Sequence, residues 1–207
     1  MVRKPLPSWA DDGVGEAIVS FVRGVCNPAS PRYVPPDDRI AVLDSDGTLW
    51  CEQPASVLAC FIMDHLTQPA LGQPWPVDGA VIQAAADDDY VFFQLLDPRH
   101  LCQTLLLGSA GLSPEAFIGQ VHAFLATARH PRFGLPFGQV VSKPMLELLA
   151  LLEARQFRVF IAAGGGVEFV RAVSEPLFGV PREGVTGASR TVHLSCTGRR
   201  DVTTAAF

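Results

Sequence analysis

Apolar residues recur along the chain at two spacings, one typical of amphipathic helices and one typical of buried strands. Two short apolar runs, residues 39–43 and 157–162, are too brief for helices, and we predict parallel strands there. Longer segments place apolar side chains three and four residues apart, which predicts helices. The predicted helices span residues 16–25, 55–66, 77–86, 90–96, 114–128, 144–155 and 167–178.

The order of these elements predicts the fold class. A strand is followed by a helical stretch, then by a helix, a second strand, the glycine turn 164–166 and another helix. This order favours an α/β fold, a Rossmann-like open sheet of parallel strands with a helical cap inserted after the first strand. The stretch 184–207 could add a third strand and an edge ribbon. In such sheets the working site lies at the carboxyl ends of the strands, where Asp44 and Ala163 fall.

Composition and charge narrow the classes of partner. The chain has 207 residues, of which 48% are hydrophobic, so it can bury a sizeable core. Its formal net charge is −5 and lysine occurs only at positions 4 and 143, which argues against a nucleic-acid partner. Five scattered cysteines predict neither a disulfide scaffold nor a zinc site. No apolar run is long enough to span a membrane and no signal peptide is recognised, so a cytoplasmic location is expected.

The stretch Asp44-Ser45-Asp46-Gly47-Thr48 sets two carboxylates at the end of the first predicted strand. A carboxylate there can attack phosphorus as a nucleophile, the role that suits Asp44. Asp46, two residues on, could protonate the leaving oxygen and then activate water. Two close negative charges facing a phosphate need a hard cation, which predicts Mg²⁺, and free amides of the turn can cradle phosphate oxygens. The alternative is an ordinary acidic turn, because Asp, Ser and Gly are common turn formers.

The string A-V-L-D-S-D-G-T-L-W-C-E-Q-P, residues 41–54, resembles the first motif of the haloacid dehalogenase-like hydrolase superfamily, nearest to its phosphoserine-phosphatase-like branch. Members are mostly Mg²⁺-dependent phosphatases acting on small phosphorylated metabolites. The resemblance implies that Asp44 is the nucleophile and a metal ligand. It implies that Asp46 is the general acid/base and also a metal ligand. Phosphate or substrate binding is then expected from Ser45, Gly47, Thr48, Glu52, Gly164, Gly165 and Arg132.

The stretch from Ser142 to Phe169 resembles the helix, strand and glycine turn of the family's second motif, with two departures. The position of the family's phosphate-binding Ser or Thr is occupied by Ala163, which has no hydroxyl. No lysine follows Lys143, and no acidic motif follows an apolar strand near the end. Arg132, within A-R-H-P-R-F-G, is a candidate substrate contact where the cap returns to the core.

The resemblance implies three parts: residues 1–52 and 139–207 as the two halves of the core, and residues 53–138 as the helical cap. We expect a C-terminally shortened, incomplete core whose first strand has an unpaired edge open to self-association. Three hypotheses follow. The chain is a Mg²⁺-dependent phosphatase of weak activity, an impaired relative that binds Mg²⁺ or phosphate without turnover, or a remnant without independent function.

Overall fold

The computed structural model describes residues 4–67, 77–164, 166–187, 189–194 and 200–205. Its central sheet has three parallel strands in the order β1 (Ile40–Asp44), β2 (Arg158–Ala163) and β3 (Val185–Gly187). The register pairs Asp44 with Ala162, so the carboxyl ends of β1 and β2 lie level with each other. The predicted α/β fold with a Rossmann-like parallel sheet is confirmed.

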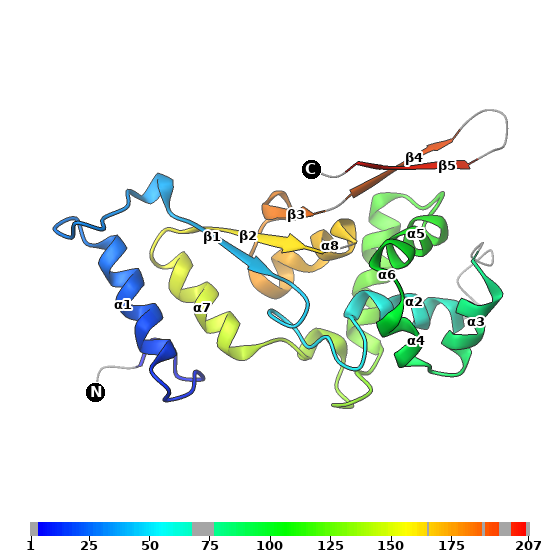
Figure 1. The fold of residues 1–207 in the computed structure, drawn as a ribbon, viewed down its shortest axis with the longest axis horizontal. Coiled ribbons are helices and arrows are strands. Elements are labelled where there is room, and N and C mark those ends of the chain that lie inside the picture. Colours follow the sequence, from blue (N-terminus) through cyan, green and yellow to red (C-terminus); the bar gives the residue numbers. More distant parts are fainter. Residues whose placement is uncertain (1–3, 68–76, 165, 188, 195–199, 206–207) are drawn as a thin grey trace.

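Helices fill the intervals between the strands (Figure 1). Every helix predicted from the apolar spacing is found, with ends shifted by at most two residues. The helices are α1 (Val14–Cys26), α2 (Val57–Thr67), α3 (Gly79–Ala86), α4 (Tyr90–Leu95), α5 (Pro98–Gly108), α6 (Pro114–Thr127), α7 (Lys143–Glu153) and α8 (Val167–Phe178), with short 3₁₀ turns at Pro36–Asp38, Phe137–Gln139 and Arg182–Gly184.

Helix α5 is absent from the predicted set, although its start carries a clear local signal. The side chain of Asp97 accepts a hydrogen bond from the Arg99 amide at 2.7 Å, and Pro98 occupies the first helical position. This is the same arrangement that correctly predicts the start of α6, where Ser113 accepts from the Ala116 amide at 3.2 Å. A cap residue followed by proline therefore marks both helix starts.

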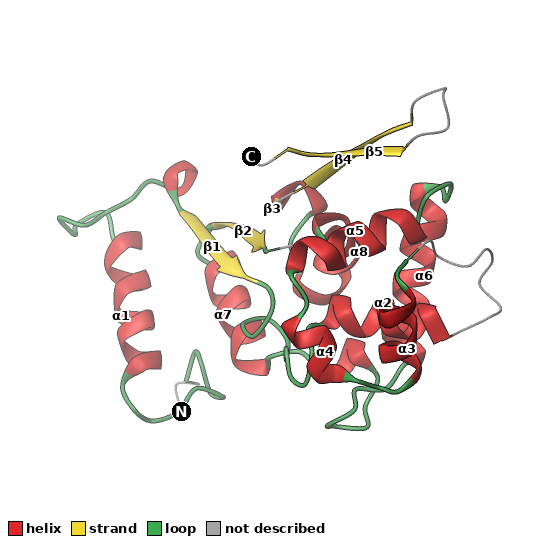
Figure 2. Ribbon diagram, turned by 45° about the vertical axis from the view of Figure 1, so that its right-hand side comes forward, coloured by secondary structure: helices red, strands yellow, loops and turns green. Residues whose placement is uncertain are grey.

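Helices α2 to α6 form a group that we call the helical insertion, because it lies in the chain between β1 and α7. Figure 2 shows this group gathered at one end of the molecule, beyond the carboxyl ends of β1 and β2. Its packing is continuous with that of the sheet. The ring of Phe61 on α2 lies 5.2 Å from that of Phe169 on α8, and both side chains are buried. One hydrophobic core therefore joins the insertion to the helices beneath the sheet.

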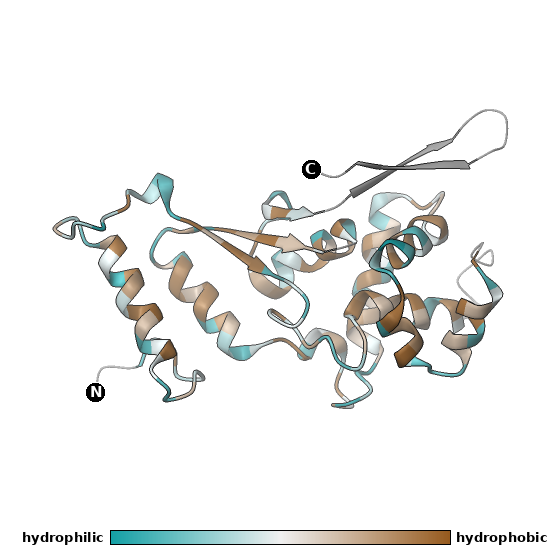
Figure 3. Cartoon of the chain, in the orientation of Figure 1, coloured by the Kyte–Doolittle hydropathy of each residue, from teal (hydrophilic) through white to brown (hydrophobic). Residues whose placement is uncertain are grey.

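In the part of the chain that the structure describes, helices pack against one face of the sheet. Leu43 and Ile161 face the main core, and Ala41 packs in a second cluster with residues of α1 and α7. Side chains alternate along a strand, so Ile40 and Val42 point to the opposite face. These two side chains remain 52% and 59% exposed. Figure 3 shows β1 as a hydrophobic strand, which makes this exposure notable in a parallel sheet, a kind that is usually covered on both faces.

Strand β1 is an edge strand in the described part of the sheet, since β2 is its one paired neighbour there. The predicted unpaired edge of the first strand is therefore present among the residues that the structure describes. Strands β4 (Ser189–Leu194) and β5 (Arg200–Ala205) form an antiparallel ribbon, but this ribbon is a separate sheet and does not extend the edge of the central sheet as expected. No helix within the described ranges is long and apolar enough to cross a membrane.

Candidate active site

The site begins in a tight turn directly after β1. The carbonyl of Ser45 accepts hydrogen bonds from the amides of Thr48, at 3.3 Å, and Leu49, at 2.8 Å. Gly47 has a φ of 70°, a left-handed conformation that glycine adopts without steric cost. The chain is thereby turned back on itself, so the side chains that follow β1 stay at the end of the sheet.

Two further contacts hold this turn against the rest of the core. The amide of Ser142 donates to the carbonyl of Leu49 at 2.7 Å, which fastens the turn to the segment preceding α7. Trp50 is buried, and its ring lies 5.5 Å from that of Phe178 at the end of α8. The turn is therefore fixed by backbone and by aromatic packing, as a preorganised site requires.

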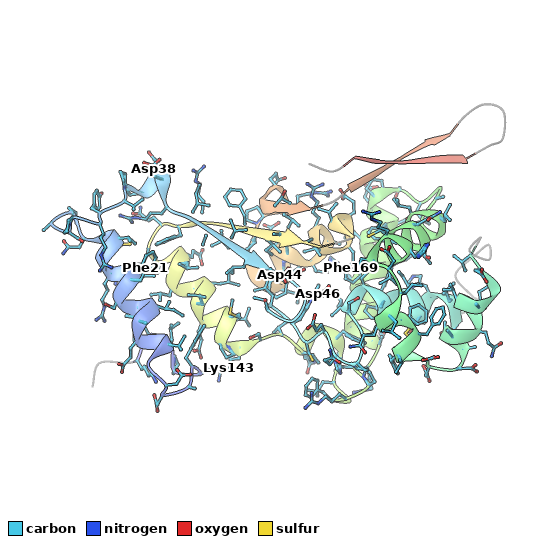
Figure 4. All side chains as sticks on the ribbon, in the orientation of Figure 1. Phe21, Asp38, Asp44, Asp46, Lys143 and Phe169 are labelled. Atoms are coloured by element: carbon cyan, nitrogen blue, oxygen red, sulfur yellow. The ribbon has the colours of Figure 1, made fainter. Side chains whose placement is uncertain are left out.

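Asp44 and Asp46 lie together at the carboxyl end of β1, on the side of the sheet nearest the helical insertion (Figure 4). Asp44 is exposed, whereas Asp46 is half-buried. The indole Nε1–H of Trp50 donates to Oδ1 of Asp46 at 2.6 Å and so fixes that carboxylate in one orientation. The two predicted catalytic carboxylates are thus brought together, one open to solvent and one held by the protein.

Burial raises the pKa of the Asp46 carboxyl above its ordinary range. The hydrogen bond from Trp50 opposes this effect because it stabilises the charged form, and the nearby carboxylates of Asp44 and Glu52 raise the pKa further. The net direction is upward. A carboxyl with a raised pKa keeps its proton to higher pH, which suits a proton donor.

Glu52 comes close to the same turn. Its carboxylate lies only 2.9 Å from the position that a Cβ would take at Gly47. A side chain at position 47 would therefore both require a strained φ and displace Glu52. Gly47 allows the close approach of Glu52 to the turn, so that Asp44, Asp46 and Glu52 form one acidic group.

The glycine turn after β2 faces this group from the neighbouring strand. Gly164 is exposed, and no atom lies within 4 Å of the position where its Cβ would be. Ala163 is buried and, like its neighbours, has no hydroxyl to offer a ligand. Gly165, a predicted phosphate-binding residue, lies outside the described residues.

Gly166 is the point where the helical insertion meets the glycine turn. Its amide donates to Sγ of Cys102 on α5 at 3.1 Å. A Cβ on Gly166 would lie 2.7 Å from Cδ2 of Leu58 on α2, so a side chain there would displace Leu58 and would also be strained by the φ of 63°. Cys102 and Leu58 have no role in the sequence-based site, because nothing in their local pattern links α2 and α5 to the end of β2.

A cavity of about 310 Å³ lies between these parts. It is bounded by the β1 turn, the glycine turn and helices α2, α4 and α5. Its lining residues are Asp46, Glu52, Gln53, Ser56, Leu58, Phe93, Gln94, Leu96, Pro98, Leu101, Cys102 and Gly164. Of the predicted site residues, Asp46, Glu52 and Gly164 contribute to this lining.

Arg132 lies elsewhere. Its amide donates to Nδ1 of His130 at 3.2 Å, and its guanidinium lies 5.4 Å from the ring centre of Phe133. It belongs to a turn closed by Arg129, whose guanidinium donates to the Gly134 carbonyl at 2.7 Å. This turn is absent from the lining of the 310 Å³ cavity. A role for Arg132 in substrate binding therefore stays a prediction without a contact to the site.

No set of three or more His, Cys, Asp or Glu side chains in the described ranges is arranged to enclose a metal ion. Mg²⁺, however, is commonly held by one or two carboxylates together with water and substrate phosphate. Asp44 and Asp46 offer two carboxylates and a backbone carbonyl at one strand end. These oxygen donors fit a Mg²⁺ site in which water and substrate complete the coordination. They are too few for a site made of protein ligands alone.

Neither a protein-family model nor a curated protein sequence matches the chain. Among solved structures, it is similar to a phosphoserine phosphohydrolase-like protein from Francisella tularensis subsp. tularensis SCHU S4. The two are 15% identical with a TM-score of 0.41, and the match covers 79% of this chain and 64% of the other. The chain therefore spans less than two thirds of the length of that structure, and the likeness carries no argument about the site.

Proposed function

We propose that the chain is a phosphomonoester hydrolase of the haloacid dehalogenase-like kind, acting on a small phosphorylated metabolite. The observation that carries this proposal is the pair Asp44 and Asp46 at the carboxyl end of β1, one exposed and the other held by Trp50 at 2.6 Å. The motif in residues 41–54, which resembles the first motif of that superfamily, supports the same assignment.

The proposed reaction follows from the different environments of Asp44, which is exposed, and Asp46, which is half-buried. An oxygen of Asp44 attacks phosphorus and the bond from phosphorus to the ester oxygen breaks, leaving an aspartyl-phosphate. Asp46, whose raised pKa favours the protonated form, gives its proton to the departing oxygen. Asp46 then takes a proton from water as that water attacks the aspartyl-phosphate. Inorganic phosphate leaves, and both carboxyl groups return to their starting states.

Mg²⁺ would be held by the Asp44 carboxylate and by Asp46 through its backbone carbonyl. When bound, the ion neutralises the repulsion between the acidic group and the phosphate dianion. Ser45, Gly47 and Thr48 support this arrangement as the turn that keeps both aspartates at the strand end. Glu52 adds negative charge near Gly47, which increases the need for a cation.

The activity is expected to be weak. Ala163 and Gly164 supply no hydroxyl for the transferring phosphoryl group, and losing one preorganised donor costs about 10²–10³ in rate. The described lining of the cavity includes no Lys, Arg or His. The same two observations favour a second candidate function, a protein that binds Mg²⁺ or phosphate without turnover.

Hydrolysis of p-nitrophenyl phosphate, with and without magnesium chloride, separates these candidates. We expect slow, magnesium-dependent release of nitrophenol that is lost in Asp44→Asn and in Asp46→Asn. Asp38→Asn is the matched control, since Asp38 is an exposed aspartate just before the opposite end of β1 (Figure 4). Phosphate protection against thermal unfolding without nitrophenol release would support the binding candidate instead.

A further inference from the structure

The cavity beside Asp46 is lined by two chemically different sets of side chains. The turn after β1 supplies the carboxylates of Asp46 and Glu52, which we call the acidic end. The insertion supplies aliphatic and aromatic side chains, which we call the apolar end, namely Leu58, Phe93, Leu96 and Leu101. We infer that this cavity takes a small phosphoryl ligand whose remaining part is apolar and has no second anionic group. This inference rests on the proposed function for the placement of the phosphoryl group at the acidic end.

Three of the four side chains at the apolar end, those of Leu58, Phe93 and Leu101, are buried in the core. Phe93 is 1% exposed and packs against Phe92, with ring centres 5.6 Å apart. Leu101 on α5 is also buried, and Leu58 on α2 closes against Gly166. Walls that are already packed bind an apolar group without first having to become ordered. A volume of about 310 Å³ is at the lower end of the range for ligand pockets, so the apolar part is small.

The charges exclude a second anion on the ligand. The described lining includes no Lys, Arg or His, and its two carboxylates, Asp46 and Glu52, belong to the acidic end, where the phosphoryl group is placed. A carboxylate or second phosphate reaching the apolar end would lose its hydration without gaining a partner, which is strongly unfavourable. Nucleotides and bisphosphates are therefore poor ligands for this cavity.

The polar contacts at the rim suit an uncharged ligand. The amide of Gln94 on α4 donates to Oε1 of Gln53, which follows the β1 turn, at 3.4 Å. This long hydrogen bond joins the insertion to the segment that follows the β1 turn, and both side chains line the cavity. Each amide can also donate to or accept from a neutral ligand group.

Cys102 provides a way to measure occupancy without turnover. It lines the cavity, and its Sγ accepts the Gly166 amide, so a ligand in the cavity would shield it. Cys26 lies on α1, away from the cavity, and serves as the internal control. Cys60 is buried, with burial raising its pKa to about 12, so it stays a poorly reactive thiol at neutral pH.

The experiment measures the rate of iodoacetamide alkylation at Cys102 by peptide mass spectrometry on the full chain with magnesium chloride. Three phosphonates are compared at equal concentration: benzylphosphonate, 3-phosphonopropionate and 2-aminoethylphosphonate. Benzylphosphonate is expected to protect Cys102 at about tenfold lower concentration than the other two, the difference that burial of a few methylene equivalents gives. Alkylation of Cys26 should be unchanged throughout.

A pair of variants tests the reason for this ranking. Leu96 is half-buried in the cavity wall, so Leu96→Lys places a cation at the apolar end and should shift the preference to 3-phosphonopropionate. Leu95→Lys changes a neighbouring side chain that is 80% exposed and outside the lining, and it should leave the ranking as it was. A thermal melt of each variant checks that it folds.

Equal or better protection by a charged phosphonate, or no protection by any of the three, would overturn the inference. Absence of phosphatase activity together with preferred protection by benzylphosphonate would contradict the hydrolase but support the binding preference. Turnover of p-nitrophenyl phosphate without any preference among the phosphonates would support the hydrolase but contradict the binding preference. The two proposals can therefore fail separately.

Discussion

The indole nitrogen of Trp50 and the carboxylate of Asp46 are joined by a hydrogen bond of 2.6 Å, made within a turn that also brings Glu52 close. Burial raises the pKa of Asp46 while this bond lowers it. The protein thus sets the protonation of its proposed acid by two opposing effects, of which burial is the larger.

Replacement of Trp50 by phenylalanine should raise the pKa of Asp46 further, because the bond that stabilises the carboxylate is lost. Carbon-13 NMR titration of the aspartate carboxyl groups measures this without any need for activity. Trp9→Phe is the control, since the indole nitrogen of Trp9 donates to the Pro144 carbonyl at 2.9 Å and not to a carboxylate. An unchanged or lowered Asp46 pKa in Trp50→Phe would contradict the assignment.

Asp46→Asn should increase stability at neutral pH. The folded-state pKa of Asp46 is raised, so the folded chain binds a proton more tightly than the unfolded chain. The free energy of unfolding then falls as pH rises from the unfolded pKa, about 4, through the folded pKa. The asparagine variant does not lose this stability. Its free energy of unfolding, measured by urea denaturation, should exceed that of the parent chain at pH 7 but not below about pH 4. Equal advantages at both pH values would count against a raised pKa.

Gly164→Ser should restore part of the missing phosphoryl contact. Gly164 lines the cavity and its Cβ would enter open space, whereas Ala163 is buried. We expect phosphatase activity to rise by about tenfold or more. The largest possible gain is about 10²–10³ in rate, the factor that one preorganised donor contributes. Gly164→Ala adds the same Cβ without the hydroxyl. Similar rates for the serine and alanine variants would show that the hydroxyl has no effect.

Self-association through β1 is expected at high protein concentration. Ile40 and Val42 are more than half exposed on a strand whose outer edge pairs with no other strand among the described residues. A lysine on an edge strand disfavours pairing, so Val42→Lys should shift sedimentation velocity profiles toward monomer. Val91→Lys is the matched control, because Val91 is 63% exposed but lies on α4. Identical profiles for the two variants and the parent chain would exclude this edge as the contact.

Much of the framework is predictable from sequence because it depends on local patterns. The apolar runs of β1 and β2 and the glycines after β2 predict the sheet and its working end. The turn at Gly47 is likewise predicted by residue type. These features follow from propensity and periodicity within a few residues.

The cavity is not predictable in the same way, because its walls come from segments far apart in the chain. Cys102 meets Gly166 across 64 positions, a contact set by the packing of the insertion and not by any local motif. The indole nitrogen of Trp50 donates to Asp46, a contact that residue type and spacing alone do not predict. Long-range contacts of this kind need the folded chain.

The most direct measurement of the central claim is chemical trapping of phosphate on Asp44. The chain is incubated with acetyl phosphate and magnesium chloride, treated with borohydride to reduce any aspartyl-phosphate, and mapped by peptide mass spectrometry. The account predicts that residue 44 is recovered as homoserine in the parent chain and in Asp38→Asn, and that the product is absent from Asp44→Asn. Reduction at another carboxylate, or none at position 44, would contradict the claim that Asp44 is the nucleophile.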